Sequence, residues 1–281
     1  MKKPIKRVAT IHDLCGVGKA ALTNIMPVLA TLGVEVCPVP TMILTTHTGG
    51  FNIPKIVELK GYIDDAVKHY VDINIEFEGI FVGYLGSINN IDGTLKFLEK
   101  LKNDNTLVVF DPIFGDNGKY YCNFNESYSE NLKKLIRYSK IITPNFTEAC
   151  ILAGEEILIE INEKELLHIS RKLHYLGCED VVITSVPLKD KNKIGTSIYS
   201  GKSDSIQMII ANKLEKSYPG TGDIFTSVLI GSYLKGKSLL NSVQDSCEFV
   251  ERCIIESNKY DYPTKEGVLL ESSLKYLNNV L

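Results

Sequence analysis

The residues best suited to chemistry lie in the stretch Ser217-Tyr218-Pro219-Gly220-Thr221-Gly222-Asp223-Ile224-Phe225. Gly220 and Gly222 allow the backbone to turn tightly into a helix that we expect over residues 222–236. The first N–H groups of that helix lack partners and lie at the positive end of its dipole, so they favour a phosphate or another oxyanion. A carboxylate beside that anion, Asp223, is unfavourable unless it acts, for example by taking a proton from an attacking hydroxyl. The stretch alone is equally compatible with an ordinary helix start, in which Asp223 complements the dipole.

Further carboxylates follow other apolar stretches. Thr106–Phe110 is typical of a buried strand and runs directly into Asp111-Pro112-Ile113-Phe114-Gly115-Asp116. Carboxylates on such a turn suit Mg²⁺, which proteins hold through one or two carboxylates, waters and substrate phosphates. Turn-forming residues without a ligand are the alternative. Glu148 falls in the first turn of a helix that opens at Pro144, where an acid that only complements the helix dipole is the alternative.

Two more loops carry polar groups. Thr41–Phe51 contains several threonines and His47 before two glycines, so it could line a pocket for a small polar ring or form a strand edge whose threonines bond their own backbone. Gly83–Ser87 follows the short apolar strand Gly79–Val82, as expected of a binding loop at the carboxyl edge of a parallel sheet.

One glycine-containing stretch, Gly16-Val17-Gly18-Lys19, resembles a P-loop only superficially. Asp13 stands where the pattern needs its first glycine, and Ala20 replaces the Ser or Thr that binds Mg²⁺. We therefore expect a turn over His12–Gly18 and no Walker-type nucleotide site.

The elements that must position these groups alternate between strands and helices. This alternation predicts an α/β fold with a mostly parallel central sheet and helices on both faces. Segments 188–200 and 203–212 predict a small antiparallel addition, and without linkers or repeats residues 1–281 predict a single domain. The loops after the strands then share one edge, where the polar groups together indicate phosphoryl transfer to a small alcohol. The other expected strands are Arg7–Ile11, Val34–Val39, Ile141–Thr143 and Asp180–Thr184; the other expected helices are Lys19–Leu32, 55–75, one ending near Leu101, 126–138, Glu163–Leu176, 238–257 and the tail 263–281.

The composition narrows the partners. The chain has 281 residues and a formal net charge of -3, with its basic residues scattered, so neither nucleic acid nor an anionic membrane is an expected partner. No signal-peptide core and no apolar run of membrane-spanning length is evident. The seven cysteines form no CxxC pair, which favours reduced thiols and a cytoplasmic protein.

Several motifs in the same order resemble those of a known family. Gly220-Thr221-Gly222-Asp223, with Thr143-Pro144-Asn145-Phe146-Thr147-Glu148 upstream, resembles the ribokinase superfamily. Within it, Thr46–Gly49, Gly83–Ser87 and Asp111–Asp116 resemble the pyridoxal/pyridoxamine kinases. The resemblance runs from about Val8 beyond the helix at 222–236 and implies a ribokinase-like kinase domain.

The resemblance implies ATP-dependent phosphorylation of the 5′-hydroxymethyl group of a vitamin B6 vitamer by a homodimer that uses Mg²⁺ and, in some members of the family, K⁺. Asp223 would be the base, and the N–H groups of Gly220, Thr221 and Gly222 would form the anion hole. Two further sets of residues are implied: Asp111, Asp116, Thr143, Asn145, Glu148, Thr184 and Ser185 for the nucleotide, with Asp111 and Glu148 for the metal, and Met42, His47, Thr48 and Tyr84 for the vitamer ring.

The first loop departs from the family pattern. Pyridoxal kinases usually carry Ser-His there, whereas this chain has Ile11-His12 followed by Asp13. Either Asp13 or His12 could bond the ring nitrogen, and hydroxymethylpyrimidine kinases of the thiamine pathway also carry an aspartate in this loop. Such a kinase is the first alternative. A nucleotide- or vitamer-binding protein without turnover is the second, and the intact glycine loop with Asp223 argues against it.

Overall fold

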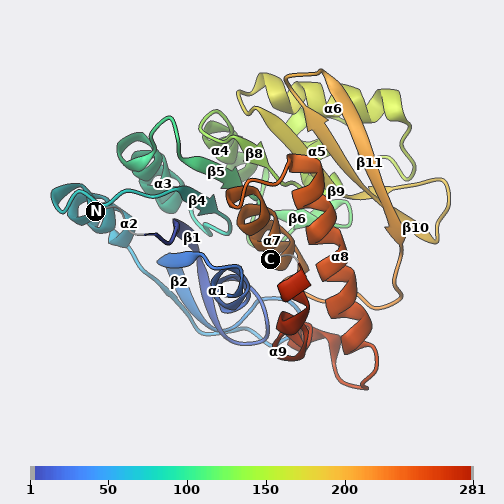
Figure 1. Cartoon of the computed structure of the whole chain (residues 1–281), viewed down its shortest axis with the longest axis horizontal. Coiled ribbons are helices and arrows are strands. Elements are labelled where there is room, and N and C mark those ends of the chain that lie inside the picture. Colours follow the sequence, from blue (N-terminus) through green and yellow to red (C-terminus); the bar gives the residue numbers. More distant parts are fainter. Residues whose placement is uncertain (1–3, 280–281) are drawn as a thin grey trace.

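A computed structural model describes residues 4–279 and is built around a nine-stranded sheet (Figure 1). Its strand order is β11-β10-β9-β8-β5-β4-β1-β2-β3. The six strands from β9 to β2 in this order are parallel, whereas β3 at one end and β10 and β11 at the other are antiparallel to their neighbours. The strands are β1 (Arg7–Val17), β2 (Glu35–Thr46), β3 (Ile56–Glu58), β4 (Gly79–Val82), β5 (Leu107–Phe110), β8 (Ile141–Ile142), β9 (Asp180–Pro187), β10 (Lys193–Ser200) and β11 (Ser205–Asn212), with a separate small hairpin of β6 (Gly115–Asp116) and β7 (Lys119–Tyr120).

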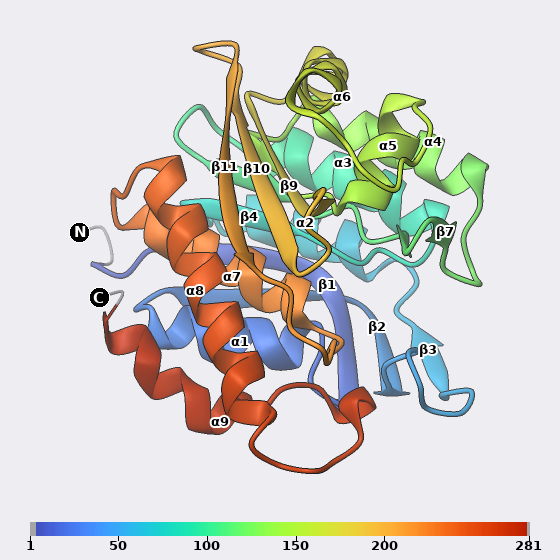
Figure 2. The ribbon, with the colours of Figure 1, turned by 90° about the vertical axis from the view of Figure 1, so that its right-hand side faces the viewer.

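Helices cover both faces of the sheet (Figure 2). One face packs against α1 (Leu22–Thr31), α7 (Thr221–Leu234) and α8 (Leu239–Ser257). The other face packs against α2 (Tyr62–Asp72), α3 (Ile88–Leu101), α4 (Glu126–Ile136), α5 (Phe146–Ala153) and α6 (Glu163–Tyr175). The chain then runs through η1 (Thr264–Glu266), α9 (Leu270–Ser273) and η2 (Leu274–Asn279).

Strand residues alternate between these two cores. In β4, Ile80 and Val82 lie in the core under α2 and α3, whereas Phe81 between them lies in the core under α1 and α7. All four residues of β4 are buried, as expected of a parallel strand covered on both faces. The predicted α/β class, the parallel sheet and the antiparallel addition are therefore confirmed.

The first strand is longer than the sequence indicated. The stretch from His12 that we expected to turn continues β1 to Val17, and β2 continues beside it to Thr46. The register between the two strands shifts between His12 and Leu14. The pairing with β2 supplies partners for backbone groups that would otherwise need a turn, and α1 consequently begins at Leu22 instead of Lys19.

Two other expectations need correction. The helix expected over 55–75 begins only at Tyr62, after Gly61 in the left-handed region (φ 78°), because residues 56–58 pair with β2 instead. The tail expected to be helical over 263–281 forms short helical pieces up to residue 279, and its last two residues lie outside the described part of the chain.

The position of β1 makes a topological switch point at the carboxyl edge of the sheet. From β1 the chain crosses through α1 to β2, and later it crosses through α2, on the opposite face, to β4 on the other side of β1. The loops after β1 and β4 therefore diverge. In open α/β sheets such a switch point is where ligands bind.

Candidate active site

The start of α7 lies against the end of β1 and the segment before α1, and it is shaped by Gly220. Gly220 has a φ of 79°, and a Cβ there would lie 2.2 Å from the carbonyl oxygen of Lys19. Asn24 ties the two segments together, since its Nδ2 donates to the carbonyl oxygens of Lys19 (2.9 Å) and Gly220 (3.2 Å). No side chain caps the helix, so the first N–H groups of α7, from Thr221 on, keep the capacity to bind an anion.

The carboxylate of Asp223 is buried and held through both of its oxygens. Oδ2 accepts a hydrogen bond from the N–H of Ala21 (2.6 Å), and Oδ1 lies 3.1 Å from Nε2 of His12. The other ring nitrogen of His12, Nδ1, lies 2.7 Å from Oδ1 of Asp13. The structure thus brings three of the predicted residues into one buried chain, Asp13–His12–Asp223.

The charge state of His12 follows from these neighbours. Burial opposes a charged ring, but the two carboxylates outweigh it, Asp223 most strongly, and raise the pKa of His12 to about 10. An imidazolium can donate a hydrogen bond to each carboxylate, and the N–H of Asp13 also lies 3.0 Å from Nδ1.

The close packing of His12 requires Gly83 at the end of β4. A Cβ on Gly83 would lie 2.1 Å from Cδ2 of the His12 ring. The glycine that follows β4 in the sequence thus makes room for a side chain from β1, which explains part of the Gly83–Ser87 motif.

Ala21, whose N–H binds Asp223, has an unusual backbone conformation. It precedes α1 with φ 58° and ψ -144°, a region that side-chain-bearing residues rarely adopt. Such strain costs about 1–3 kcal/mol and tends to occur at functional sites. Its amino acid type gives no signal of this, so the sequence did not single it out.

Asp111 lies next to the start of α7. Its Oδ2 accepts a hydrogen bond from Oγ1 of Thr226 (3.1 Å), which lies 3.2 Å from Oγ1 of Thr143. Burial and the charge of Asp223 raise the pKa of Asp111 to about 7. Thr226 was missed from the sequence, although its position three residues after Asp223 places it on the same side of α7.

Glu148 and Asn145 hold the loop that follows Asp111. The Oε1 atom of Glu148 accepts from the N–H groups of Phe114 (3.0 Å) and Gly115 (3.3 Å), and its Oε2 from that of Asn145 (2.9 Å). Asn145 caps α5 and donates through Nδ2 to the carbonyl oxygen of Gly115 (2.8 Å). Three backbone bonds already engage Glu148, so Asp111 is the freer of the two carboxylates.

The few carboxylates at the site fit a metal ion whose other ligands come from substrate phosphates and water. Within residues 4–279, no three His, Cys, Asp or Glu side chains are grouped so that they could hold a metal ion. Mg²⁺ needs only one or two carboxylates when phosphates and waters complete its shell. Asp111 meets that requirement, since it is a buried carboxylate with one side-chain donor, Thr226, among the described residues.

An apolar wall lies beside Asp13. Met42 and Tyr84 belong to a small cluster with Cys15, and the methyl end of Met42 packs on Gly86. The hydroxyl of Tyr84 accepts a hydrogen bond from Nδ2 of Asn123 (2.7 Å), and burial raises the pKa of this tyrosine to about 12. The two residues predicted to contact a ring therefore lie together.

His47 and Thr48 differ from each other. Nε2 of His47 donates to the carbonyl oxygen of Lys265 (2.6 Å), and Nδ1 accepts from the N–H of Gly49 (3.0 Å). Both ring nitrogens of His47 are thus used inside the protein, which leaves only the ring surface for contact with a ligand. Thr48 is exposed.

The remaining predicted residues lie along the carboxyl edge toward β9. Thr184 forms a parallel bridge with Asn145. Ser185 is exposed, with a φ of 57°, in the left-handed region. Asp116 is exposed as well and bonds the backbone and side chain of its neighbour Asn117. These residues therefore outline a second, more open part of the site.

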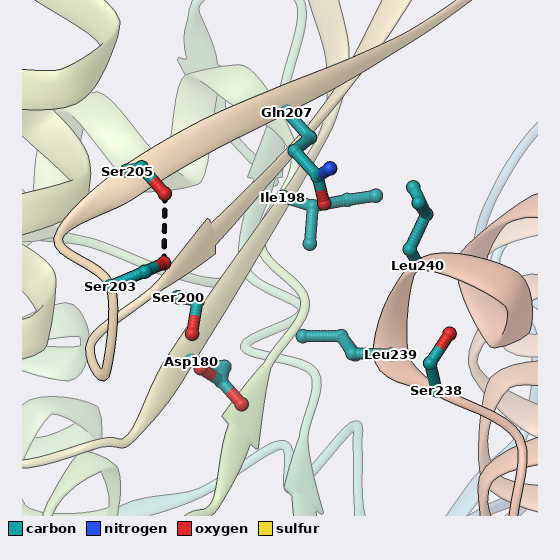
Figure 3. A pocket seen from close by; sticks show the side chains of 9 residues that line it. All are labelled: Asp180, Ile198, Ser200, Ser203, Ser205, Gln207, Ser238, Leu239 and Leu240. Carbon is teal, nitrogen blue, oxygen red and sulfur yellow. Dashed lines mark hydrogen bonds between the residues drawn. The ribbon is translucent and has the colours of Figure 1, made fainter.

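A cavity of about 350 Å³ lies elsewhere, between the hairpin β10–β11 and the start of α8 (Figure 3). It contains none of the predicted site residues. Asp180 at the amino end of β9 places it toward the opposite edge of the sheet. Its lining consists of Asp180, Ile198, Ser200, Ser203, Ser205, Gln207, Ser238, Leu239 and Leu240.

Comparison with known proteins shows the family to which the chain belongs. The sequence profile of the phosphomethylpyrimidine kinase family matches residues 26–267. The chain belongs to this family. The match spans most of the chain, including α7 and the loop around Asp111.

Similar proteins are named either pyridoxal kinases or hydroxymethylpyrimidine/phosphomethylpyrimidine kinases. A pyridoxal kinase from Arabidopsis thaliana is 29% identical over 208 residues, which cover 72% of this chain and 66% of the plant protein. A hydroxymethylpyrimidine/phosphomethylpyrimidine kinase from Aquifex aeolicus is 27% identical over 212 residues, covering 74% of this chain and 80% of that protein.

Solved structures give the same picture. A candidate phosphomethylpyrimidine kinase from Bacteroides thetaiotaomicron is 33% identical, with a TM-score of 0.95 over 99% of this chain and 96% of that chain. A second crystal form, with pyridoxal, has a TM-score of 0.93 at 33% identity and covers 98% and 96% of the two chains.

The predicted recognition, fold and enzyme class are thereby confirmed: the chain is a ribokinase-like, ATP-dependent small-molecule kinase of the vitamin B6 or hydroxymethylpyrimidine type. Among the described helices, none combines the length and apolar composition that crossing a membrane requires.

Proposed function

We propose that this kinase phosphorylates the 5′-hydroxymethyl group of a vitamin B6 vitamer, with Asp223 as the base. The observation that carries the proposal is the placement of a buried carboxylate at the uncapped start of α7. Its two oxygens each accept one hydrogen bond, from His12 and Ala21, so that lone pairs stay available for a substrate hydroxyl.

In this proposal the chain's own groups divide the work. Asp223 accepts the proton of the substrate hydroxyl as the hydroxyl oxygen bonds to the γ-phosphorus of ATP. The bond between that phosphorus and the bridging oxygen breaks, so that ADP leaves, while the N–H groups of Gly220, Thr221 and Gly222 bind the transferred phosphate. Asp111 would hold Mg²⁺, which when bound neutralises phosphate charge. Glu148 would support the metal site by fixing the loop after Asp111, a more indirect role than the metal ligand expected from the resemblance.

For the ring, we propose that Asp13 bonds a ring nitrogen while Met42 and Tyr84 pack against the ring. The Bacteroides structure with pyridoxal supports the pyridine vitamers. A hydroxymethylpyrimidine is the second candidate, favoured by the family profile and by the Aquifex relative. An aminopyrimidine could also donate hydrogen bonds to the carboxylate of Asp13.

For the nucleotide, we propose that ATP lies along the carboxyl ends of β8 and β9, against the more open part of the site. Thr184 and Ser185 would contact it, while Thr143 would act through Thr226 and Asp111. A contact of Asp116 with ATP, a need for K⁺, a homodimer, a cytoplasmic location and a single domain over residues 1–281 stay predictions from the sequence.

One experiment tests the reaction and ranks its substrates. ATP-dependent phosphorylation of pyridoxal, pyridoxine, pyridoxamine and hydroxymethylpyrimidine is measured side by side for the wild type, Asp223→Asn and the control Asp92→Asn, which lies on the exposed side of α3. We expect the pyridines to react faster than the pyrimidine. Asp223→Asn should lower kcat by at least ~10²-fold while ATP binding is retained, because an amide cannot take the proton whereas the N–H groups at the start of α7 stay in place.

Each contrary outcome has a definite meaning. Turnover retained in Asp223→Asn would refute Asp223 as the base. Preference for the pyrimidine would transfer the protein to the second candidate with the same mechanism. Ligand binding without turnover in the wild type would identify a binding protein.

A further inference from the structure

We propose that His12 is a positioning residue. Through its two nitrogens it orients Asp13 toward the substrate ring and Asp223 toward the substrate hydroxyl that reacts. The inference rests on the proposed function, in which Asp223 is the base. It replaces the expectation that His12 itself could bond the ring nitrogen.

The ring of His12 is fixed from every direction that the contacts describe. It is 1% exposed and lies at the register shift of β1. One neighbour is Phe81, in an edge-on contact with 5.9 Å between ring centroids, and another is Gly83, which leaves no space for even a methyl group. The ring therefore cannot rotate to meet a ligand without disturbing the ends of two strands.

Both nitrogens of His12 already have hydrogen-bond partners in the protein, which leaves Asp13 to bond the substrate ring. Oδ1 of Asp13 accepts from Nδ1 of His12 (2.7 Å), whereas the partner of Oδ2 among the described residues is the thiol of Cys15 (3.2 Å). A thiol is a weak donor, so Oδ2 is the oxygen that a substrate N–H can claim. The ligand class that fits is a protonated pyridine or an aminopyrimidine.

The imidazolium also balances charge. Asp13 and Asp223 are both buried, and a buried carboxylate without a partner is costly. One ring bonded to both compensates them together and sets the direction of each carboxylate. Ala21 supplies a second, separate hold on Asp223 but none on Asp13. Loss of the hydrogen bond from His12 to Asp13 should therefore have a different effect from loss of its hydrogen bond to Asp223.

Two isosteric variants separate the two hydrogen bonds. In His12→Asn the amide nitrogen takes the place of Nδ1, so the bond to Asp13 is kept and that to Asp223 is lost. In His12→Gln the amide nitrogen takes the place of Nε2, so the bond to Asp223 is kept and that to Asp13 is lost. We expect His12→Asn to lower kcat by about 10- to 100-fold with little change in the vitamer KM, the effect of one charge-assisted hydrogen bond.

For His12→Gln we expect the reverse split: the vitamer KM rises by about tenfold or more while kcat changes by less than about threefold. Equal effects of both variants on kcat and KM would overturn the proposal and leave His12 a structural residue. Retained turnover in Asp223→Asn would instead refute the proposed function, so the two failures are distinguishable.

A measurement on the wild type covers the case in which a variant does not fold. In protein with ¹⁵N-labelled histidine, the Nδ1 and Nε2 signals of His12 are followed by NMR as pyridoxal is added without ATP. We expect the Nδ1 signal to shift, because the pyridoxal ring engages Asp13. An unchanged His12 spectrum at saturating pyridoxal would overturn the proposal.

Discussion

At the scale of single residues, Asp111 and Asp223 place two buried carboxylates beside the start of α7. The charge of Asp223 contributes to raising the pKa of Asp111 to about 7, after the larger effect of burial. The imidazolium of His12 acts in the opposite direction, since it lowers the pKa of Asp111. The protonation of Asp111 is therefore balanced near neutral pH, where a cation can displace the proton.

This balance predicts a pH-dependent need for Mg²⁺. As the pH falls from 8 to 6, a growing fraction of Asp111 holds a proton that Mg²⁺ must displace. The Mg²⁺ concentration for half-maximal activity should therefore rise by about tenfold when the pH falls from 8 to 6. Steady-state rates over a series of Mg²⁺ concentrations at each pH measure it.

The control for this prediction is Asp111→Asn, which should need more Mg²⁺ at every pH and lose the dependence. If the wild type needs the same Mg²⁺ concentration at pH 6 and pH 8, Asp111 does not compete for the metal.

At the scale of elements, the start of α7 depends on its contact with the segment before α1. Gly220 has both a left-handed backbone and no space, because a Cβ would lie 2.2 Å from the oxygen of Lys19 and 2.4 Å from Nδ2 of Asn24. Gly236, just beyond the end of the same helix, has a φ of 94° but no atom near its Cβ position. An alanine at Gly236 would therefore meet backbone strain alone, whereas an alanine at Gly220 would meet both backbone strain and steric overlap.

Gly220→Ala should lower the free energy of unfolding by about 3 kcal/mol or more and lower turnover as well, because the turn proposed to bind the phosphate must move away from residues 19–24. Gly236→Ala should cost only about 1 kcal/mol, from backbone strain alone, with turnover unchanged. Urea unfolding and steady-state rates compare them. Equal losses in the two variants would mean that the contact with Lys19 carries no weight.

The elements also show what the sequence could and could not reveal. Apolar runs and glycines are local signals, so the parallel strands, α7 and the positions of Asp223 and Asp111 at the ends of their elements could be predicted. The continuation of β1 through His12 could not, because it depends on pairing with β2, and the polar residues there favour a turn when read alone. The strained N–H of Ala21 leaves no trace in amino acid type.

Contacts across the site add residues that motifs do not reveal. Thr226 lay within reach of helical spacing from Asp223, but its bond to Asp111 depends on how α7 packs against the end of β5. His47, in contrast, was predicted from its motif to contact the vitamer ring. Its residue type suits a ligand, whereas the fold gives both its nitrogens to backbone groups.

At the scale of the whole molecule, the C-terminal segment fastens loops from the first fifty residues of the chain. The carbonyl oxygen of Lys265 accepts from His47, and that of Glu266 accepts from the N–H of Lys19 (3.2 Å). Lys19 and Glu271 add an ion pair. Residues 265–271 therefore stabilise the loops that contain Lys19 and His47.

His47→Ala should lower the free energy of unfolding by about 1–3 kcal/mol, because it removes a buried hydrogen bond and leaves the carbonyl of Lys265 without its partner. Thr48→Ala, at the exposed neighbouring position, should leave stability within about 0.5 kcal/mol and alter only the vitamer KM. Thermal or urea unfolding, paired with kinetics, checks both. Unchanged stability in His47→Ala would show that the loop does not depend on this contact.

The contacts of Asp223 also set the order in which the protein can mature. His12 and Asp223 are 211 positions apart in the sequence, and Ala21 and Asp223 are 202 apart. Contacts of such separation close large loops, so they form slowly during folding. On the ribosome, the strands up to β11 emerge before Asp223, the proposed base. Recovery of turnover after denaturation should therefore report the docking of α7, a late event, and lag behind the recovery of secondary structure.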